Sequence, residues 1–252
     1  MSTAVPRLRM FAGPNGSGKS TIKSVIEPSL LGVYINPDEI EKDIRQFDFL
    51  DFTAYGVSST AAEVLPFFRE SSLMIRAGLA DEAAALRFND GKLIFCEVEV
   101  NAYFASVAAD FLRQALLAAG VTFTFETVMS SPDKVDFLRQ AQARGFRTYL
   151  YYVATEAPEI NISRVENRVR QGGHPVPKDK IVERYYRSLN LLSEAVPYAN
   201  RAYVFDNSFH GKVWLAEITD GNELEMKSDT MPLWFKTALW DKFAGAESDG
   251  EA

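Results

Sequence analysis

Residues 13–20 read Gly-Pro-Asn-Gly-Ser-Gly-Lys-Ser and fit the pattern G-x-x-x-x-G-K-[ST] at every defined position. An apolar run from Leu8 to Ala12 precedes this stretch, and a helical pattern that includes Ile22 follows it. The flanking strand and helix distinguish a phosphate-binding loop from a chance glycine-rich turn. The sequence therefore predicts a loop whose backbone N–H groups surround a polyphosphate at the start of a helix.

Each side chain of this loop has an expected task. Lys19 would reach the β- and γ-phosphates, and the Ser20 hydroxyl would bind Mg²⁺. The predicted cofactors are therefore ATP and Mg²⁺. The residues expected to contact ATP are Gly13, Pro14, Asn15, Gly16, Ser17, Gly18, Lys19, Ser20 and Thr21.

Composition limits the class of protein. The chain has 252 residues with 47% hydrophobic residues, enough for a substantial core, and its one cysteine, Cys96, excludes an internal disulfide. Two histidines are too few for a Cys/His metal cluster. No apolar stretch has the length of a membrane span, so we expect a cytoplasmic protein without a membrane partner. The net charge of −7 argues against general nucleic-acid binding.

Positive charge is concentrated in one region despite this acidic balance. Residues 139–187 contain ten Lys/Arg against five Asp/Glu, which suggests a local anionic target. Arg168, Arg184 and Arg187 are the candidate cations for a transferring phosphoryl group. They lie on a helical hairpin flanked by glycines, residues 158–192, which we expect to act as a lid. Arg164 and Arg170 are interpreted as surface charges.

Strands and helices alternate along the chain, which predicts an α/β fold with a parallel sheet covered by helices on both faces. Asp220-Gly221 indicates a hairpin turn, and residues 213–243 are expected to form a C-terminal hairpin and helix. Residues 1–244 would form a single domain, and 245–252 a disordered acidic tail. The expected strands are 7–12, 33–36, 121–126, 147–154 and 202–206; the helices between them are 18–27, 101–120, 131–145, 161–171 and 178–192.

Residues 47–100 are long for a connection between neighbouring elements, which indicates an insertion. We expect helical pieces over 47–88, with breaks at Pro66 and Gly78, and a strand within 92–100. The insertion carries apolar residues that must be buried, either as plain core or as a wall over an acceptor. In the second case Asn101 and Tyr103 would present polar atoms to the substrate. The apolar residues are Phe67, Phe68, Leu73, Met74, Leu93, Ile94 and Phe95.

Two carboxylates come at the ends of predicted strands. In α/β sheets ligands bind at the carboxyl ends of the strands, where Asp38 and Glu126 stand. Asp38 could accept a proton from an alcohol, a task for which hydrogen-bond reach matters most. Asp38 and Glu41 also have the spacing of a capping box, so a helix cap is the alternative.

Six stretches together resemble the zeta-toxin family of P-loop kinases, within the adenylate-kinase-like group. They span Leu8 to Ser208, most of the chain. The combination of Gly-Gly-His-x-Val-Pro with Asp-Asn-Ser is more specific than the loop alone. The stretches are 12–21, Ile35-Asn-Pro-Asp38, Phe123-Thr-Phe-Glu-Thr127, residues 167–177 (Asn-Arg-Val-Arg-Gln-Gly-Gly-His-Pro-Val-Pro), Arg184-Tyr-Tyr-Arg-Ser188 and Phe205-Asp-Asn-Ser208.

This resemblance implies a P-loop NTPase fold with a five-stranded sheet of order 2-3-1-4-5, and an ATP-dependent kinase for the 3′-hydroxyl of a UDP-activated amino sugar. It implies that Asp38 is the general base and that Arg168, with Arg184 or Arg187, belongs to the lid. It also assigns Asn207 to the nucleotide, and Asp110, Glu126 and Thr127 to the substrate. An antitoxin partner is implied, although many relatives resemble stand-alone kinases.

The chain departs from the family pattern after Glu126. Typical members continue with Gly-Thr-Gly-Arg, whereas this chain has Thr127-Val-Met-Ser130 and lacks the arginine. The departure concerns the substrate more than the reaction. Two other functions stay open: a kinase of polynucleotide 5′-hydroxyls, which the acidic composition disfavours, and a non-catalytic nucleotide switch.

Overall fold

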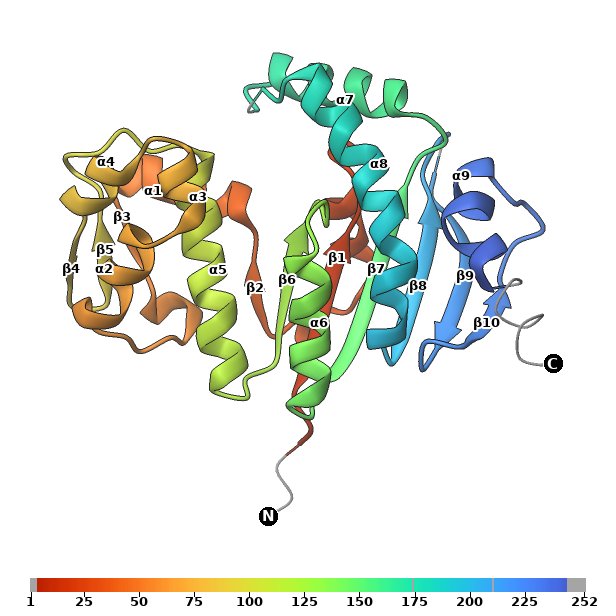
Figure 1. Cartoon of the computed structure of the whole chain (residues 1–252), viewed down its shortest axis with the longest axis horizontal. Coiled ribbons are helices and arrows are strands. Elements are labelled where there is room, and N and C mark those ends of the chain that lie inside the picture. Colours follow the sequence, from red (N-terminus) through yellow and green to blue (C-terminus); the bar gives the residue numbers. More distant parts are fainter. Residues whose placement is uncertain (1–3, 174, 210, 244–252) are drawn as a thin grey trace. The chain divides into compact units, whose positions relative to one another are not determined.

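The computed structural model describes residues 4–173, 175–209 and 211–243, and it divides into two compact units (Figure 1). Unit 1 comprises residues 1–30 and 126–252, and unit 2 comprises residues 31–125. The division falls within strand β6 (Phe123–Thr127). The tail expected at 245–252 and His174 of the Gly-Gly-His motif lie outside the described residues.

Unit 1 is built on strands that lie in the order β10-β9-β8-β7-β1. β1 (Arg7–Ala12) pairs in parallel with β7 (Arg147–Ala154), and β7 in parallel with β8 (Arg201–Asp206). β9 (Val213–Thr219) and β10 (Glu223–Met226) form the predicted hairpin, and β9 joins β8 antiparallel. The sheet is therefore mixed, because the C-terminal hairpin extends it.

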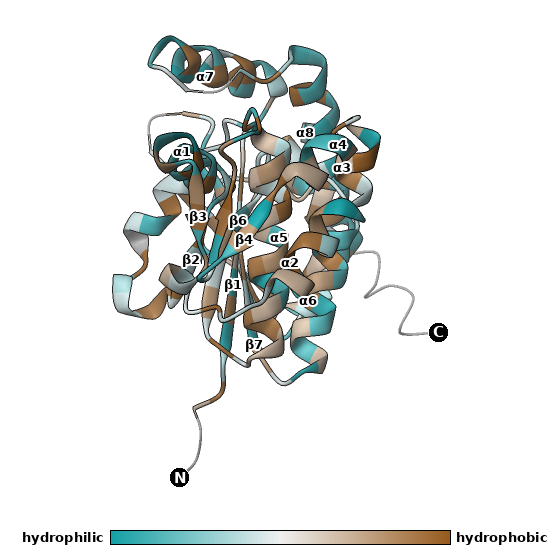
Figure 2. Cartoon of the chain, turned by 90° about the vertical axis from the view of Figure 1, so that its left-hand side faces the viewer, coloured by the Kyte–Doolittle hydropathy of each residue, from teal (hydrophilic) through white to brown (hydrophobic). Residues whose placement is uncertain are grey.

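The helices of unit 1 follow the predicted order. They are η1 (Lys19–Val25), η2 (Pro28–Leu30), α6 (Asp133–Ala143), α7 (Pro158–Arg170), α8 (Lys178–Ala195), η4 (Val196–Tyr198), α9 (Leu233–Phe235) and the π-helix η5 (Lys236–Trp240). In Figure 2, α7 carries hydrophilic and hydrophobic residues in turn, and it buries Asn161 and Val165. Leu8, Met10, Leu150 and Val204 of the strands are fully buried, so the sheet forms the core of this unit.

One helix prediction in unit 1 needs correction. The helix expected over 18–27 is a shorter 3₁₀ helix, η1, because Thr21 N and Oγ1 both donate to the Gly18 carbonyl, at 3.1 and 2.6 Å. Ser24 Oγ repeats this three-residue spacing on Thr21 at 2.7 Å. Hydroxyls bonded to nearby carbonyls compete with the α-helical pattern. The C-terminal helix predicted within 213–243 is observed, because residues 233–243 are helical throughout, with the π-helical stretch η5 in the middle.

Unit 2 contains a parallel pair of strands, β2 (Val33–Ile35) with β6, and a small antiparallel sheet of order β3-β5-β4. The small sheet falls in the insertion. The remaining elements are α1 (Pro37–Phe47), β3 (Phe49–Asp51), η3 (Thr53–Tyr55), α2 (Ala61–Arg69), α3 (Ser72–Arg76), α4 (Ala80–Ala85), β4 (Arg87–Asn89), β5 (Lys92–Ile94) and α5 (Ala102–Ala118).

The insertion supplies much of the core of unit 2. Phe68, Met74, Leu93 and Phe95 are at most 1% exposed. Gly78, with φ 71°, separates α3 from α4 as expected, but Pro66 lies inside α2 and does not break it. A capping box between Thr60 and Glu63 stabilises the start of that helix. These four residues are therefore buried within unit 2, as both the core and the wall alternative require.

The architecture is an α/β fold with a mixed sheet of mainly parallel strands and flanking helices, consistent with a P-loop NTPase. Within the described residues, no helix combines the length and apolar character needed to cross a membrane.

Candidate functional site

The loop that follows β1 has a backbone shape that only glycine permits at two places. Gly13 has φ 139°, and a Cβ atom there would lie 2.0 Å from the Val153 carbonyl oxygen of β7. Gly16 has φ 74°, and a Cβ atom there would lie 2.6 Å from the Asn161 carbonyl oxygen. Any side chain at these positions would displace the loop from the Val153 and Asn161 carbonyls against which it packs.

Lys19 is folded onto the loop that it follows. Its Nζ donates to the carbonyls of Gly13 at 2.8 Å and Pro14 at 3.0 Å. Two buried atoms of the same loop, Asn15 Oδ1 and Ser17 Oγ, have no hydrogen-bond partner among the described residues. Buried polar atoms in native proteins are normally paired, so this loop is suited to a polar ligand.

Ser20 meets Glu126 where the loop ends. Ser20 Oγ donates to Glu126 Oε2 at 3.1 Å, and Glu126 is 6% exposed at the end of β6. A hydroxyl and a carboxylate oxygen are the kinds of ligand that Mg²⁺ takes together with substrate phosphates. Glu126, which the resemblance assigns to the substrate, is thus in contact with the predicted metal ligand.

The segment after β8 is tied to the loop by two side chains. Asn207 Nδ2 donates to the Ser17 carbonyl at 2.7 Å, which places this predicted nucleotide residue beside the loop. Lys212 Nζ donates to the Thr21 carbonyl at 2.6 Å, and burial lowers the pKa of Lys212 from its ordinary value. Lys212 is not among the residues predicted from the sequence, because no local pattern around it indicates a contact 191 residues away.

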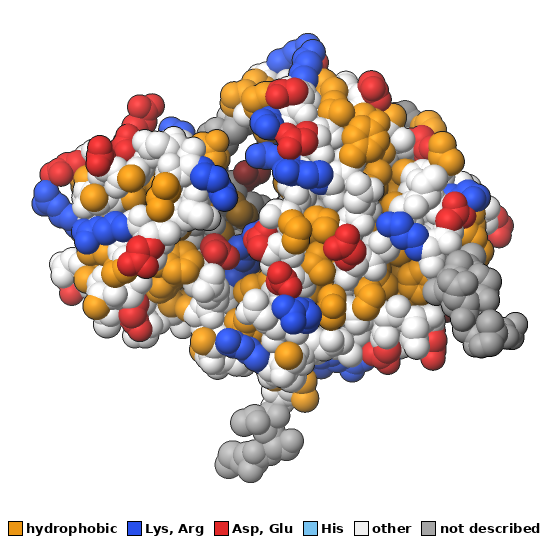
Figure 3. All heavy atoms as spheres, in the orientation of Figure 1, with side chains coloured by type: hydrophobic (Ala, Val, Ile, Leu, Met, Phe, Trp, Pro, Cys, Tyr) orange, Lys and Arg blue, Asp and Glu red, His pale blue; other side chains and the backbone are white. Residues whose placement is uncertain are grey.

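α7 and α8 carry the candidate lid arginines. α8 is held beside the end of β7 by Tyr185, whose hydroxyl donates to the Thr155 carbonyl at 2.6 Å. Arg184 precedes Tyr185 and is half-buried, whereas Arg187 is exposed and pairs with Glu183 at 3.2 Å. Basic and acidic side chains lie close together over α7 and α8 in Figure 3. Gly173 N donates to the Arg168 carbonyl at 2.9 Å, which ends α7 at the predicted glycines.

Asp38 lies in unit 2 in the first turn of α1. The helix cap is Asn36, whose Oδ1 accepts a hydrogen bond from Asp38 N at 2.9 Å. Glu41 is 2% exposed and is bonded instead to Arg45, at 2.9 and 3.0 Å. The capping-box alternative for Asp38 and Glu41 is therefore wrong, because the polar side chain two residues earlier takes that position.

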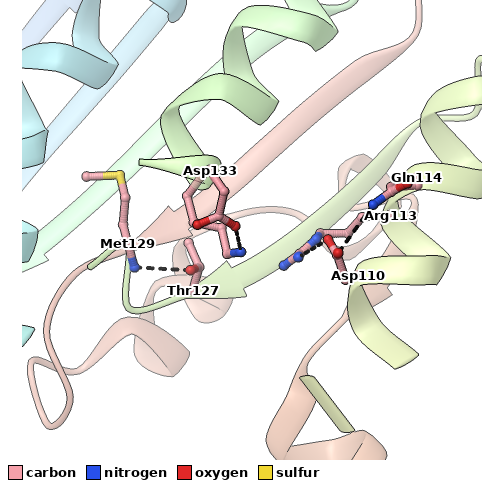
Figure 4. A network of polar contacts seen from close by, with 7 residues as sticks. Asp110, Arg113, Gln114, Thr127, Met129 and Asp133 are labelled. Atoms are coloured by element: carbon pink, nitrogen blue, oxygen red, sulfur yellow. Dashed lines mark hydrogen bonds and ion pairs between the residues drawn. The ribbon is translucent and has the colours of Figure 1, made fainter. Parts of the chain in front are cut away.

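Other predicted substrate residues lie on α5, in unit 2. Asn101 caps this helix by accepting a hydrogen bond from Tyr103 N at 3.0 Å, and Tyr103 is 46% exposed. Asp110 accepts hydrogen bonds from Arg113 Nη2 at 2.6 Å and Gln114 Nε2 at 3.2 Å (Figure 4). The buried Arg113 guanidinium also lies 4.9 Å from the ring centroid of Phe125. These contacts fix the Asp110 carboxylate in one orientation.

Thr127 has a structural contact that the resemblance does not anticipate. Its Oγ1 accepts a hydrogen bond from Met129 N at 3.0 Å (Figure 4), and Met129 has φ 51°. The Thr127 hydroxyl thus stabilises the left-handed turn that replaces the Gly-Thr-Gly-Arg pattern. Its O–H can still act as a donor.

The structure thus gathers the loop 13–21, Glu126 and Asn207 in unit 1, and places Asp38, Asn101, Tyr103 and Asp110 in unit 2. A separate hollow of about 430 Å³ lies at the start of β7, the strand end opposite to the one that contacts the loop. Its lining includes Phe146 and Arg147, so it has no part in the predicted site.

Comparison with protein families gives a match to the zeta toxin model over residues 97–215. The resemblance predicted from the sequence is therefore confirmed. An uncharacterized protein of Haemophilus influenzae is 31% identical over 65 residues, which are 26% of this chain and 46% of that protein.

Two solved structures share the fold. A chain of the AvrRxo1-ORF1:AvrRxo1-ORF2 complex, also solved with ATP, has a TM-score of 0.53 at 16% identity. The alignment covers 95% of this chain and 63% of that one. A chain of the PezAT chromosomal toxin–antitoxin system of Streptococcus pneumoniae has a TM-score of 0.50 at 15% identity, covering 97% and 81%. This chain thus spans less than two thirds of the AvrRxo1 chain and under half of the Haemophilus protein.

Proposed function

We propose that this chain, with its zeta-toxin-like segment, is an ATP-dependent kinase that phosphorylates a hydroxyl of a small molecule. The contact between Ser20 Oγ and Glu126 Oε2, at 3.1 Å beside the phosphate-binding loop, carries the proposal. It brings a hydroxyl and a carboxylate to the place where a phosphoryl-transfer enzyme needs a metal ligand. A simple anion-binding loop has no need of the carboxylate.

ATP would be held by residues 13–21 and Asn207. The buried unpaired atoms Asn15 Oδ1 and Ser17 Oγ support a ligand at this loop. The oxygens of Ser20 and Glu126 suit Mg²⁺, with Ser20 as the direct ligand. When bound, Mg²⁺ neutralises part of the charge on the β- and γ-phosphates.

Asp38 would be the general base. It would take the proton of the acceptor hydroxyl as that oxygen bonds to the γ-phosphorus and the bond from phosphorus to the bridging oxygen breaks, which releases ADP. Asp38 is exposed in the first turn of α1, and Asn36 supplies the cap, so capping does not explain the residue. Hydrogen-bond reach decides whether a carboxylate can do this work.

Arg168 and Arg184 would stabilise the transferring charge. Arg184 is favoured over Arg187 because Arg187 is already paired with Glu183 at 3.2 Å and is 53% exposed. A guanidinium can meet two phosphate oxygens at once, which suits a planar transferring group. Residues 158–192 would then act as a lid.

The acceptor would be the 3′-hydroxyl of a UDP-activated amino sugar, which rests on the family resemblance. Asn101, Tyr103, Asp110 and Thr127 would contact it, and Glu126 would serve both the acceptor and the metal ligand. The Arg113–Asp110 pair supports this role, because a fixed carboxylate can orient sugar hydroxyls.

The proposed kinase has one domain and a protein partner. Residues 1–244 would act as one kinase domain with strand order 2-3-1-4-5, in which 47–100 lies near the acceptor site. Because PezAT is a toxin–antitoxin system, an antitoxin protein is the proposed partner, and phosphorylation of the acceptor would be the toxic act.

The test is incubation with ATP, Mg²⁺ and a panel of UDP-sugars, nucleosides and oligonucleotides, followed by mass spectrometry. A single added phosphate on a UDP-sugar supports the proposal. Phosphate added only to oligonucleotides would show a polynucleotide kinase instead. If ATP binds and no panel member gains phosphate, the small-molecule kinase proposal for these acceptors is wrong.

A further inference from the structure

The first turns of α7 are attached to the phosphate-binding loop by a buried asparagine. Asn161 is 0% exposed, and its Nδ2 donates to the Asn15 carbonyl at 2.5 Å. Asn161 Oδ1 accepts from the Thr155 hydroxyl, and Asn161 backbone atoms lie against Gly16. One face of α7 is therefore held on the tip of the loop.

Arg164 lies on this same face, one turn further along. Residues three or four apart are neighbours on a helix surface, so Arg164 follows Asn161 directly and Arg168 follows Arg164. Arg164 is half-buried, and its Nη1 atom is buried without a hydrogen-bond partner among the described residues. Arg170, at the opposite side of the helix, donates to Asn167 at 3.4 Å and is exposed.

An unpaired buried donor on a charged group is costly, more so than on a neutral one. Such a donor is expected in a native structure where a ligand accepts its hydrogen bond. The neighbouring loop has the same property, since Asn15 Oδ1 and Ser17 Oγ are also buried and unpaired among the described residues. These three atoms come from two elements that Asn161 holds together.

We propose that Arg164 is a nucleotide-binding residue whose guanidinium contacts a phosphate oxygen of the nucleotide held by loop 13–20. This inference rests on the proposed function only in naming ATP as the ligand. A phosphate is the fitting partner because it offers several acceptor oxygens to a planar cation. The sequence interpretation of Arg164 as a surface charge disregards its position on the same face as Asn161.

The attachment through Asn161 gives Arg164 a role different from that of the lid. Arg164 is in place before any closure of residues 158–192, since the turn that precedes it is already bonded to the loop. It should therefore act on the affinity for ground-state nucleotide. Arg168 and Arg184 should act mainly on turnover.

The test is calorimetric titration of the full chain with ATP and with tripolyphosphate, for wild type, Arg164→Gln, Arg164→Lys and Arg170→Gln. Arg164→Gln should weaken the binding of both ligands on the order of tenfold, as expected for one lost charge-assisted contact. Arg164→Lys should recover part of the affinity. Arg170→Gln is the matched control on the same helix and should bind as wild type.

Thermal unfolding separates binding from structure. Unchanged affinity in Arg164→Gln, or equal loss in Arg170→Gln, would overturn the inference while leaving the kinase proposal standing. The inference would also be overturned by a large drop in Tm for Arg164→Gln together with wild-type affinity in Arg164→Lys. The arginine would then have a structural role. Arg164-dependent binding without phosphorylation of any acceptor would support the inference and count against the kinase. If wild type binds neither ligand, both are wrong.

Discussion

Ser20 and Glu126, 106 residues apart in the chain, are joined by a 3.1 Å hydrogen bond from the serine hydroxyl to the carboxylate. One residue ends the phosphate-binding loop, and the other ends the apolar part of β6. The pair unites a phosphate clamp and an acidic group in one unit of the molecule.

Glu126→Gln keeps the size of the side chain and removes its charge. We expect turnover to fall on the order of 10²-fold and the Mg²⁺ concentration for half-maximal rate to rise, because the carboxylate no longer supports the metal ligand. The measurement is the rate as a function of Mg²⁺. An unchanged Mg²⁺ dependence with a raised acceptor KM would show that Glu126 serves the acceptor alone.

Lys19→Ala and Asp38→Asn should fail in different ways. Lys19 contacts phosphate in both the ground and transition states, so its loss should weaken ATP binding and turnover together. Asp38→Asn should cost roughly 10²–10⁴ in rate with ATP affinity nearly kept. ATP titrations beside kinetics distinguish the two. Equal loss of ATP binding in both variants would contradict the base assignment.

Lysine should not replace the lid arginines. Arg168→Lys and Arg184→Lys should lower kcat, because lysine lacks the planar fork that meets two oxygens together. Arg187→Lys is the matched comparison on α8 and should stay near wild type, since its contact with Glu183 tolerates either cation. Near-normal kcat in all three variants would remove the lid from the mechanism.

Tyr103→Ala tests the acceptor side. Tyr103 is 46% exposed in the first turn of α5, so its loss should leave the Tm almost unchanged. The acceptor KM should rise, while slow ATP hydrolysis continues at the wild-type rate. The matched core variant Phe95→Ala should instead lower the free energy of unfolding by roughly 3–5 kcal/mol, and with it the Tm, because Phe95 is 1% exposed. A destabilised Tyr103→Ala with unchanged acceptor KM would contradict the prediction.

The stability of unit 1 should decrease at alkaline pH through Tyr151. Burial, then the nearby Tyr203, raises the pKa of Tyr151 from 10.0 to about 12. The unfolded chain therefore releases this proton first, so the contribution is complete below pH 10 and is lost as the pH rises toward 12. Denaturant titrations between these pH values should show a smaller decline for Tyr151→Phe. Tyr103→Phe, an exposed tyrosine in unit 2, should decline as wild type does.

Several features of the fold follow from short stretches of sequence. The phosphate-binding loop is identified by eight consecutive residues, because glycine positions and spacing alone define its backbone. β7 has the predicted bounds, and the hairpin at Asp220-Gly221 and the Asn101 cap are also observed. These features depend on alternation, turn residues and caps, which act between residues close in the chain.

Short sequence patterns do not predict the structure where two local conformations or two capping residues compete. Asn36 and Asp38 can each cap α1, and the structure uses Asn36. Residues 19–25 have a helical pattern, yet their hydroxyls favour three-residue bonds and give a 3₁₀ helix. The energies of such alternatives differ by about 1 kcal/mol, so a pattern cannot choose between them.

The sequence by itself determined that a phosphate-binding loop lies between a strand and a helix, that strands and helices alternate, and that arginines gather between residues 139 and 187. Only the tertiary structure decided which side chains meet that loop. Glu126 reaches Ser20, Asn161 reaches Asn15 and Lys212 reaches Thr21, over 106, 146 and 191 residues. No periodicity encodes such contacts, because they arise when separate elements pack side by side around a shared core.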